Sequence, residues 1–166
     1  MLYEQEGMKM NPKLHWDGTL RMPQALKLGH DDVRAELLRA TAVPGPIGEA
    51  AERVGHLCLP HFELEEATVF PVFGILRDLA SGEFDPDMAM VLPLIADFDA
   101  MHRSLSDHHD AIESAVWTLL VAAHKEDNRE VAEFAYCLRA HERLESDVIY
   151  PTVFLIRQQI QQKLRM

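Results

Sequence analysis

The feature that most constrains this chain is an eleven-residue pattern that occurs at residues 61–71 and returns at residues 141–151. Both copies read His-x-x-Leu-Glu, followed by four residues and then by an aromatic residue and a proline. Because a helix brings residues four positions apart onto one face, each copy is predicted to point an imidazole and a carboxylate the same way. Two such helices facing each other would gather two His and two Glu side chains, a set suited to binding metal.

Length and composition describe an ordinary acidic globular protein. The chain has 166 residues, of which 48% are hydrophobic and 26% charged, and this length predicts a single domain. The formal net charge of −11 argues against a nucleic-acid backbone or an anionic membrane as a partner. The two cysteines, Cys58 and Cys137, are too few for a disulfide framework. Because the chain has neither a signal-peptide pattern nor an apolar run of about 18 residues, we expect a cytoplasmic protein.

Apolar residues recur at helical spacing along four segments, which short polar or proline-rich breaks separate. Residues 1–22 are interpreted as an irregular leader, with Trp16 as a candidate for packing against the helices. Pro23 suits the first turn of a helix, and this helix ends at the breaker cluster of residues 43–48. The other three predicted helices span about residues 49–80, 87–124 and 129–163.

The predicted fold is all-α: an antiparallel up-down-up-down four-helix bundle over residues 23–166, behind the irregular N-terminal leader. Strand signals are nearly absent from the sequence. Pro60 and Pro71 are expected to kink the second helix, because an interior proline removes a backbone hydrogen bond. The offset between the repeats suggests two similar helical hairpins, and the sequence leaves the oligomeric state open.

Each of the other two helices offers an inward-facing His to the same centre. His30 lies on the apolar stripe of the first helix, and His102 lies on that of the third. The predicted metal ligands are therefore His30, His61, Glu65, His102, His141 and Glu145. Imidazole together with carboxylate suits iron, manganese or zinc. The alternative, solvated or ion-paired groups without metal, conflicts with the cost of burying two carboxylates.

This order and spacing of ligands resembles the hemerythrin-like family, the HHE cation-binding domains, over roughly residues 25–155. The resemblance implies a non-heme centre of two iron ions inside the bundle. It implies that the two ions are held by His30 with His61 and by His102 with His141. Glu65 and Glu145 would bridge the ions, with an oxo or hydroxo group completing the bridge.

The sequence departs from the oxygen-carrying members of that family. Those proteins have a second His four residues after the third-helix ligand, where this chain has Ser106. Their last carboxylate is an Asp five residues after the His, where this chain has Glu145 at four. His109 is not expected to replace the missing ligand, because seven helical residues separate it from His102 by about 10 Å. Four His ligands instead of five argue against reversible oxygen carriage.

The preferred hypothesis is a binding module that binds or senses oxygen, nitric oxide or a related small molecule at the metal centre. The first alternative is a di-iron oxidoreductase that reduces peroxide or oxygen, or an iron donor for repair of iron–sulfur centres. The second is a bundle in which the metal is only structural. Redox catalysis needs a source of electrons, and the sequence contains no flavin or nucleotide motif, so binding is preferred. The predicted partner is thus a small diatomic molecule or peroxide.

Several residues next to the ligands are open to two interpretations. Phe70 and Tyr150 are expected to pack in the core, although a Tyr there is also placed to donate a hydrogen bond to a metal-bound oxygen. Cys58 and Cys137 are expected to be small buried residues rather than redox groups. Glu66 is expected on the surface or as a hydrogen-bond acceptor for a ligand. Whether the two cysteines, Tyr150 or His109 line the site is left open.

Overall fold

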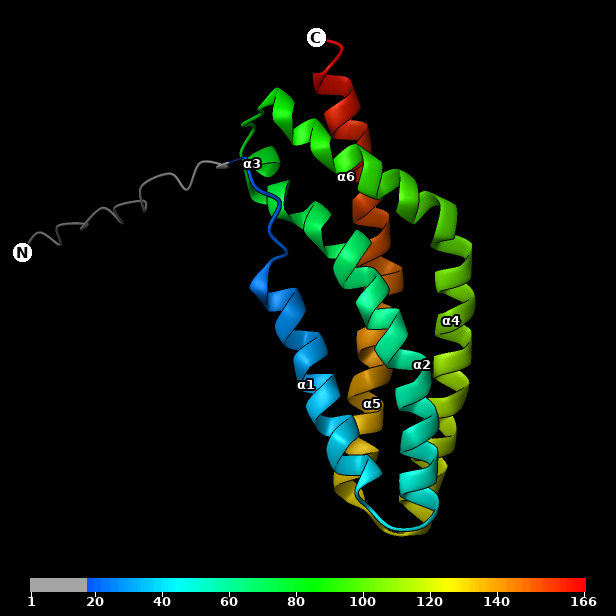
Figure 1. Ribbon diagram of the computed structural model, residues 1–166. Coiled ribbons are helices and arrows are strands. Elements are labelled where there is room, and N and C mark those ends of the chain that lie inside the picture. Colours follow the sequence, from blue (N-terminus) through cyan, green and yellow to red (C-terminus); the bar gives the residue numbers. More distant parts are fainter. Residues whose placement is uncertain (1–17) are drawn as a thin grey trace, which may run out of the picture.

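A computed structural model describes residues 18–166, and this part of the chain is helical and contains no strand. Its long helices lie side by side, and the first four of them, in chain order, run in alternating directions (Figure 1). They are α1 (Gln24–Thr41), α2 (Pro46–Thr68), α4 (Val91–Lys125), α5 (Arg129–Leu144) and α6 (Tyr150–Lys163), of which α6 continues the line of α5. This arrangement is compatible with the predicted four-helix bundle, in which α5 and α6 together take the place of the fourth helix.

The link between α1 and α2 is as short as the proline- and glycine-rich cluster predicts. Gly45 has φ +83°, a conformation that side chains rarely adopt, and Pro46 occupies the first turn of α2. A Cβ on Gly48 would collide with the carbonyl oxygen of Val43, so the two helices approach closely only because Gly stands there. Pro60 lies inside α2, which continues through it.

The second predicted helix, about residues 49–80, is divided into three elements. The α-helix α2 ends at Thr68, a 3₁₀ helix η1 (Phe70–Ile75) follows, and a short helix α3 (Leu76–Ala80) completes the segment. Pro71 stands in the first turn of η1 and cannot donate the N–H that an α-helix would require there. The break therefore falls where the interior proline was expected to kink the helix.

The second hairpin begins with a 3₁₀ turn, η2 (Pro86–Met90), and continues through α4 and α5. Asn128 caps α5 by accepting a hydrogen bond from the backbone N–H of Val131 at 3.1 Å. The chain then widens into a π-helical turn, η3 (Glu145–Ile149), before α6. Pro151 lies in the first turn of α6, so the chain continues past this proline after a wider, π-helical turn.

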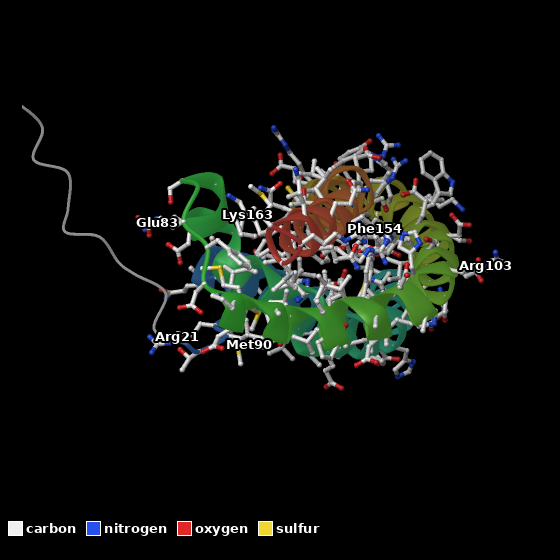
Figure 2. The ribbon with its side chains drawn as sticks, turned by 90° about the horizontal axis from the view of Figure 1, so that it is seen from above. Arg21, Glu83, Met90, Arg103, Phe154 and Lys163 are labelled. Carbon is white, nitrogen blue, oxygen red and sulfur yellow. The ribbon has the colours of Figure 1, made fainter. Side chains whose placement is uncertain are left out.

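Two apolar clusters fill the interior, one on each side of a polar belt. The first joins α1, α2, α4 and α5 and includes Leu37, Val54, Phe62, Val116 and Leu138. The second joins η1, α4 and α6 and includes Phe70, Ile95, Phe98, Tyr150 and Val153. Figure 2, seen from above, shows side chains filling the space between the helices, with Arg103 on the outside.

The last residues of the predicted leader pack on the second cluster. Leu20 and Met22 are partly buried against it, and the backbone of Arg21 passes so close to Gly74 that a Cβ there would meet it at 2.6 Å. Trp16 and the rest of the predicted leader lie outside the described residues. Among residues 18–166, no helix is long and apolar enough to cross a membrane.

Candidate metal centre

Six ionisable side chains from four helices meet in the belt between the two apolar clusters. Four of them are almost completely buried, with exposed fractions of 0% for His30 and Glu65 and 1% for His61 and Glu145. The other two, His109 and His141, lie at the edge of the belt, His109 being 8% exposed. At least one of these side chains thus comes from each of α1, α2, α4 and the segment formed by α5 and η3. These side chains form two groups that could each hold a metal ion.

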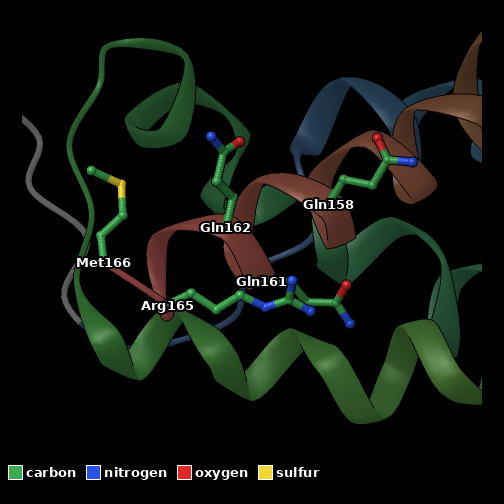
Figure 3. Close-up of a pocket in the computed structure, with 5 residues that line it drawn as sticks. All are labelled: Gln158, Gln161, Gln162, Arg165 and Met166. Atoms are coloured by element: carbon green, nitrogen blue, oxygen red, sulfur yellow. The ribbon is translucent and has the colours of Figure 1, made fainter.

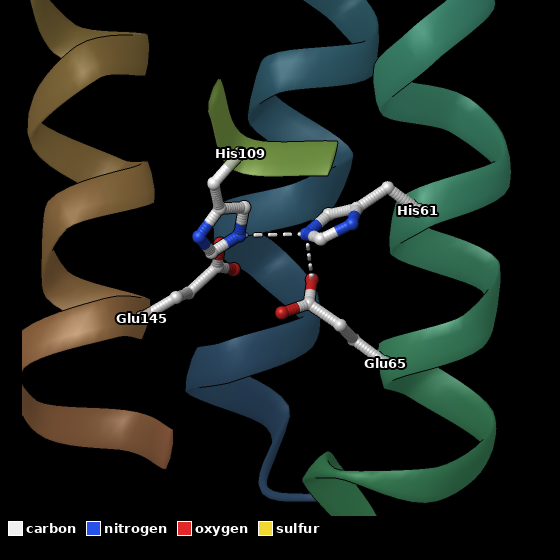
Figure 4. Close-up of side chains that lie close together, drawn as sticks. All are labelled: His61, Glu65, His109 and Glu145. Carbon is white, nitrogen blue, oxygen red and sulfur yellow. Dashed lines mark hydrogen bonds and ion pairs between the residues drawn. The ribbon is translucent and has the colours of Figure 1, made fainter. Parts of the chain in front are cut away.

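The first group comprises His61 and Glu65 from α2, His109 from α4 and Glu145 from η3 (Figure 4). The Nε2 atoms of His61 and His109 are 2.8 Å apart. The Oε2 atom of Glu65 is 3.5 Å from Nε2 of His61, and the Oε2 atom of Glu145 is 3.5 Å from Nε2 of His109. Two imidazole nitrogens and two carboxylates therefore converge on one small volume.

The second group comprises His30 from α1 with His141 and Glu145 from the α5–η3 segment. The Oε1 atom of Glu145 is 3.1 Å from Nε2 of His30 and 3.0 Å from Nε2 of His141. Glu65 also reaches this group, because its Oε2 atom is 3.4 Å from Nε2 of His30. The second group thus has the same types of ligand atom as the first.

The two carboxylates lie between the two pairs of imidazoles. Glu145 turns Oε1 towards His30 and His141 and turns Oε2 towards His109, as a carboxylate that bridges two ions must. Metal–ligand bonds of about 2.1 Å place neighbouring ligand atoms about 3.0 to 3.4 Å apart in octahedral or tetrahedral sites. The nitrogen–oxygen distances of both groups, 3.0–3.5 Å, agree with that spacing.

Hydrogen bonds from outside the two groups hold the ligands in orientation. Nδ1 of His30 donates to Oε1 of Glu66 at 3.0 Å, and Arg34 donates to the same oxygen at 2.8 Å. Nδ1 of His109 is 2.8 Å from the Ser146 hydroxyl. Such partners fix which ring nitrogen faces inward, as metal-bound His requires. Glu66 is therefore the hydrogen-bond acceptor that the sequence offered as one of its two interpretations.

Tyr150 also touches the centre directly. Its hydroxyl donates to Oε1 of Glu65 at 2.7 Å and lies 3.3 Å from Nε2 of His109. Its ring stacks on that of His109, with centroids 5.4 Å apart and an interplanar angle of 9°. Tyr150 is thus both a core residue and a hydrogen-bond donor to a candidate bridging carboxylate.

Burial and neighbouring charges shift the protonation of the centre in opposite directions. Burial opposes charge on His30, but hydrogen bonds to Glu145 and Glu65 outweigh it and raise the pKa to about 9. Burial, reinforced by His109, lowers the pKa of His61 to about 3. Burial opposes charge on Glu145 too, yet the neighbouring imidazoles of His109, His141 and His30 hold its pKa well below the usual range.

Several buried polar atoms of the centre have no hydrogen-bond partner among the described residues. They are Nδ1 of His61, Nε2 of His141, Oε2 of Glu65 and Glu145, and both carboxylate oxygens of Glu142. A buried polar atom without a partner costs about 1–3 kcal/mol, and more when it is charged. Cations placed between the carboxylates would compensate this cost, so the donor set fits a pair of metal ions.

His102 lies outside both groups, which differs from the sequence prediction. Its ring packs against those of Phe98, Tyr150 and Phe154, with centroids 5.2–5.7 Å apart. His109 instead contributes the imidazole of α4. The separation of about 10 Å between His102 and His109 holds for a helix, but the centre lies beside His109 along α4 and not beside His102.

The pairing of the imidazoles also differs from the one that the family resemblance implied. His61 pairs with His109, and His30 pairs with His141, so that His30 and His61 belong to different groups. The imidazoles pair in this way because α2 faces α4 across the belt and α1 faces α5.

Four further side chains show where the sequence predicted the surroundings correctly and where it did not. Cys58 is buried as expected, and burial raises the pKa of its thiol, whereas Cys137 is exposed. Asp99, which is close to His102 in sequence, accepts a hydrogen bond from Arg157 at 2.8 Å. Glu142, which follows His141 directly, is buried beside His109, and its surface-typical residue type gave no signal of this.

A shallow hollow at the end of α6 is separate from the metal centre (Figure 3). Its lining residues are Gln158, Gln161, Gln162, Arg165 and Met166, none of which belongs to either group.

Comparisons of the chain with models of protein families, with curated proteins and with solved structures gave no match.

Proposed function

We propose that the protein binds two iron ions in a hemerythrin-like centre and uses them to bind or sense a small molecule such as oxygen, nitric oxide or peroxide. The ligands in this proposal are His30, His61, Glu65, His109, His141 and Glu145. The observation that carries the proposal is the placement of Glu145, whose two oxygens face two different pairs of imidazoles.

The chemistry of the donor set supports the choice of metal. Imidazole and carboxylate suit iron, manganese and zinc, and no thiolate belongs to either group. Two bridging carboxylates compensate part of the charge of two divalent ions, which makes the burial of both ions and ligands affordable in a low-dielectric interior. An oxo or hydroxo group between the ions would supply further negative charge. Manganese and zinc are the alternatives to iron.

The surroundings of the centre support a small ligand. His30, His61, Glu65 and Glu145 are at most 1% exposed, so a large substrate has no access to them. Each imidazole pair together with the shared carboxylates provides fewer than the six ligands that iron commonly takes. Bound iron would supply affinity for a diatomic molecule at the remaining positions.

A second candidate function, reduction of peroxide or oxygen, is favoured by the position of Tyr150. Its hydroxyl lies 2.7 Å from Oε1 of Glu65 and 3.3 Å from Nε2 of His109, and could deliver a proton beside the centre. Reduction would need an external donor of electrons. The same centre would also suit an iron donor for repair of iron–sulfur centres, provided that it releases iron readily.

The metal content of protein purified without added metal tests the first part of the proposal. We expect about two iron atoms per chain by elemental analysis, and restoration of that number when chelator-treated protein is reloaded anaerobically with Fe(II). A content below one ion per chain after reloading would contradict a two-ion centre.

Exposure of the loaded protein to gases and peroxide then separates the two candidate functions. A binding protein should give a stable spectral change with oxygen or nitric oxide in the absence of a reductant. An oxidoreductase should instead consume peroxide or oxygen continuously when a reductant is supplied.

A further inference from the structure

Glu142 is a third carboxylate at the centre, and neither group of ligands includes it. It lies on α5 between the ligands His141 and Glu145 and is only 5% exposed. Its Oε2 atom is 3.3 Å from Nε2 of His109, the nitrogen that faces the first group. Neither of its oxygens has a hydrogen-bond partner among the described residues. This side chain is therefore buried, unpartnered and directed at the centre.

The protein itself offers Glu142 almost no electrostatic compensation. Among the described residues, its ion-pair contact is with His109, and no Lys or Arg side chain pairs with it. Arg139, three residues before it on α5, donates to Glu113 instead. Burial without a hydrogen bond opposes the charged form of a carboxylate, whereas a metal ion beside it would compensate that charge.

The geometry of α5 explains how one helix serves both ions. Successive helical residues are turned by about 100°, so His141 and Glu142 leave α5 on different sides. His141 turns towards His30 of α1, whereas Glu142 turns towards His109 of α4. Glu145, one turn further on, lies between them and reaches both groups. The distance of 3.3 Å between Glu142 and His109 is that of neighbouring ligand atoms on one ion.

We infer that Glu142 is a terminal ligand of the ion held by His61 and His109, and that it makes this position the tighter of the two. The inference rests on the proposed metal centre. Two divalent ions carry four positive charges; two carboxylates would leave two of them uncompensated, and a third carboxylate leaves one. A single bridging hydroxide then neutralises the centre, which is the cheapest state to bury.

The repeat supplies an internal comparison for this assignment. Phe62 occupies the place in the first copy that Glu142 occupies in the second, directly after the ligand His. Its ring stacks on His30 with centroids 3.9 Å apart and an interplanar angle of 17°. The position at His30 is thus bordered by the ring of Phe62, and the position at His109 by the carboxylate of Glu142. The two ions are therefore expected to bind with different affinities.

Titration of metal-free protein with Mn(II), followed by calorimetry, tests the inference. The wild-type protein should bind two ions in two steps of different affinity. Glu142→Gln should weaken the tighter step about 10- to 100-fold, the range in which groups around a metal commonly act, and leave the other step unchanged. Glu113→Gln is the matched control, because it removes an equal charge from the adjacent surface and should alter neither step by more than about two-fold.

A spectrum of the Co(II)-loaded protein gives a second readout that does not depend on affinity. Visible d–d absorption strengthens when the coordination number falls, so Glu142→Gln should intensify the bands of one ion, and Glu113→Gln should not. Glu142→Asp keeps the charge but shortens the side chain, and should weaken the same step less than Gln does. This variant also carries the test if Glu142→Gln does not fold.

The outcomes separate the two proposals. If the wild-type protein binds fewer than two ions, the proposed metal centre fails and the role of Glu142 fails with it. If the wild type binds two ions and neither Glu142 variant changes a binding constant or a Co(II) spectrum, only the role of Glu142 is overturned. Equal weakening of both steps would likewise overturn it, because a ligand of one ion acts mainly on that ion.

Discussion

The two copies of the repeat place the same ligands in different surroundings. Both contribute a His and, four residues later, a Glu to the centre. The residues after the His are Phe62 and Glu142, and the aromatic residues are Phe70 and Tyr150. Phe62 and Phe70 both contact the ring of His30, whereas Glu142 and Tyr150 both approach Nε2 of His109. The centre is therefore symmetric in its ligands and asymmetric in their neighbours.

The backbone also differs between the copies where the aromatic residue follows the Glu. At the end of the first copy, the chain tightens into the 3₁₀ helix η1, whereas within the second copy it widens into the π turn η3. In the π turn, the N–H of Tyr150 bonds to the carbonyl of Glu145, five residues earlier. Five residues of regular α-helix would turn Tyr150 about 140° away from Glu145, whereas the wider turn keeps both side chains at the centre.

A shared ligand pattern therefore does not make the two candidate metal positions equivalent. The side of His30 has apolar rings that exclude water. The side of His109 has a hydroxyl and a carboxylate that can donate or accept a proton. Ligand exchange and proton transfer are thus expected on the side of His61 and His109.

The largest effect is expected when the group common to both positions is removed. Glu145→Ala should reduce the metal content from two ions per chain to less than one, because both imidazole pairs lose their shared carboxylate. Elemental analysis after anaerobic reloading measures this number. Retention of two ions would show that Glu145 does not bridge.

Substitution of the two His residues of α4 should next distinguish the structure from the prediction based on sequence. His109→Ala should lower the content from two ions to about one, because the pair with His61 is broken. His102→Ala should leave two ions, because its ring only packs against Phe98, Tyr150 and Phe154. The opposite result would restore His102 as the ligand.

A smaller effect is expected from removing the hydroxyl that distinguishes the second copy. Tyr150→Phe leaves Oε1 of Glu65 without its donor, which should cost about 1–3 kcal/mol in the free energy of unfolding of the metal-free protein. Phe70→Tyr is the reciprocal control. Urea denaturation followed by circular dichroism gives both values, and an unchanged midpoint for Tyr150→Phe would contradict the importance of this bond.

A further effect is a loss of stability of the metal-free protein between about pH 6.5 and pH 9. The pKa of His30 rises from 6.5 to about 9 on folding, so its stabilisation is complete below pH 6.5 and is lost as the pH rises through 9. Burial, reinforced by Glu145, raises the pKa of Glu142 to about 9. The folded state therefore also keeps the carboxyl proton of Glu142 to a higher pH than the unfolded state does. Chemical denaturation at a series of pH values measures the trend.

The metal-loaded protein provides the control for this pH dependence. Because metal replaces the protons on the ligands, loaded protein should lose less stability over the same interval. A metal-free protein whose stability rose from pH 6.5 to pH 9 would contradict the assigned pKa shifts.

Much of the fold could be predicted because helices carry their information locally. The breaks at residues 43–48 and 81–86 and the cap at Asn128 are short-range signals, and the observed helices end close to them. The segments that contain Pro71 and Pro151 were predicted as continuous helices and are instead interrupted by η1 and η3. The sequence indicated that Pro71 disturbs its helix, but not that one turn would tighten and the other widen.

The sequence alone determined the chemical nature of the centre: the repeat placed a His and a Glu on one face of each of two helices. The tertiary structure decided that His109 takes part instead of His102, how the imidazoles pair, and that Glu142 lies beside them. The physical reason is that periodicity determines where a side chain points around its own helix axis. The relative height of neighbouring helices depends on packing between residues far apart in the chain, and this height selects which turn of α4 faces the two glutamates.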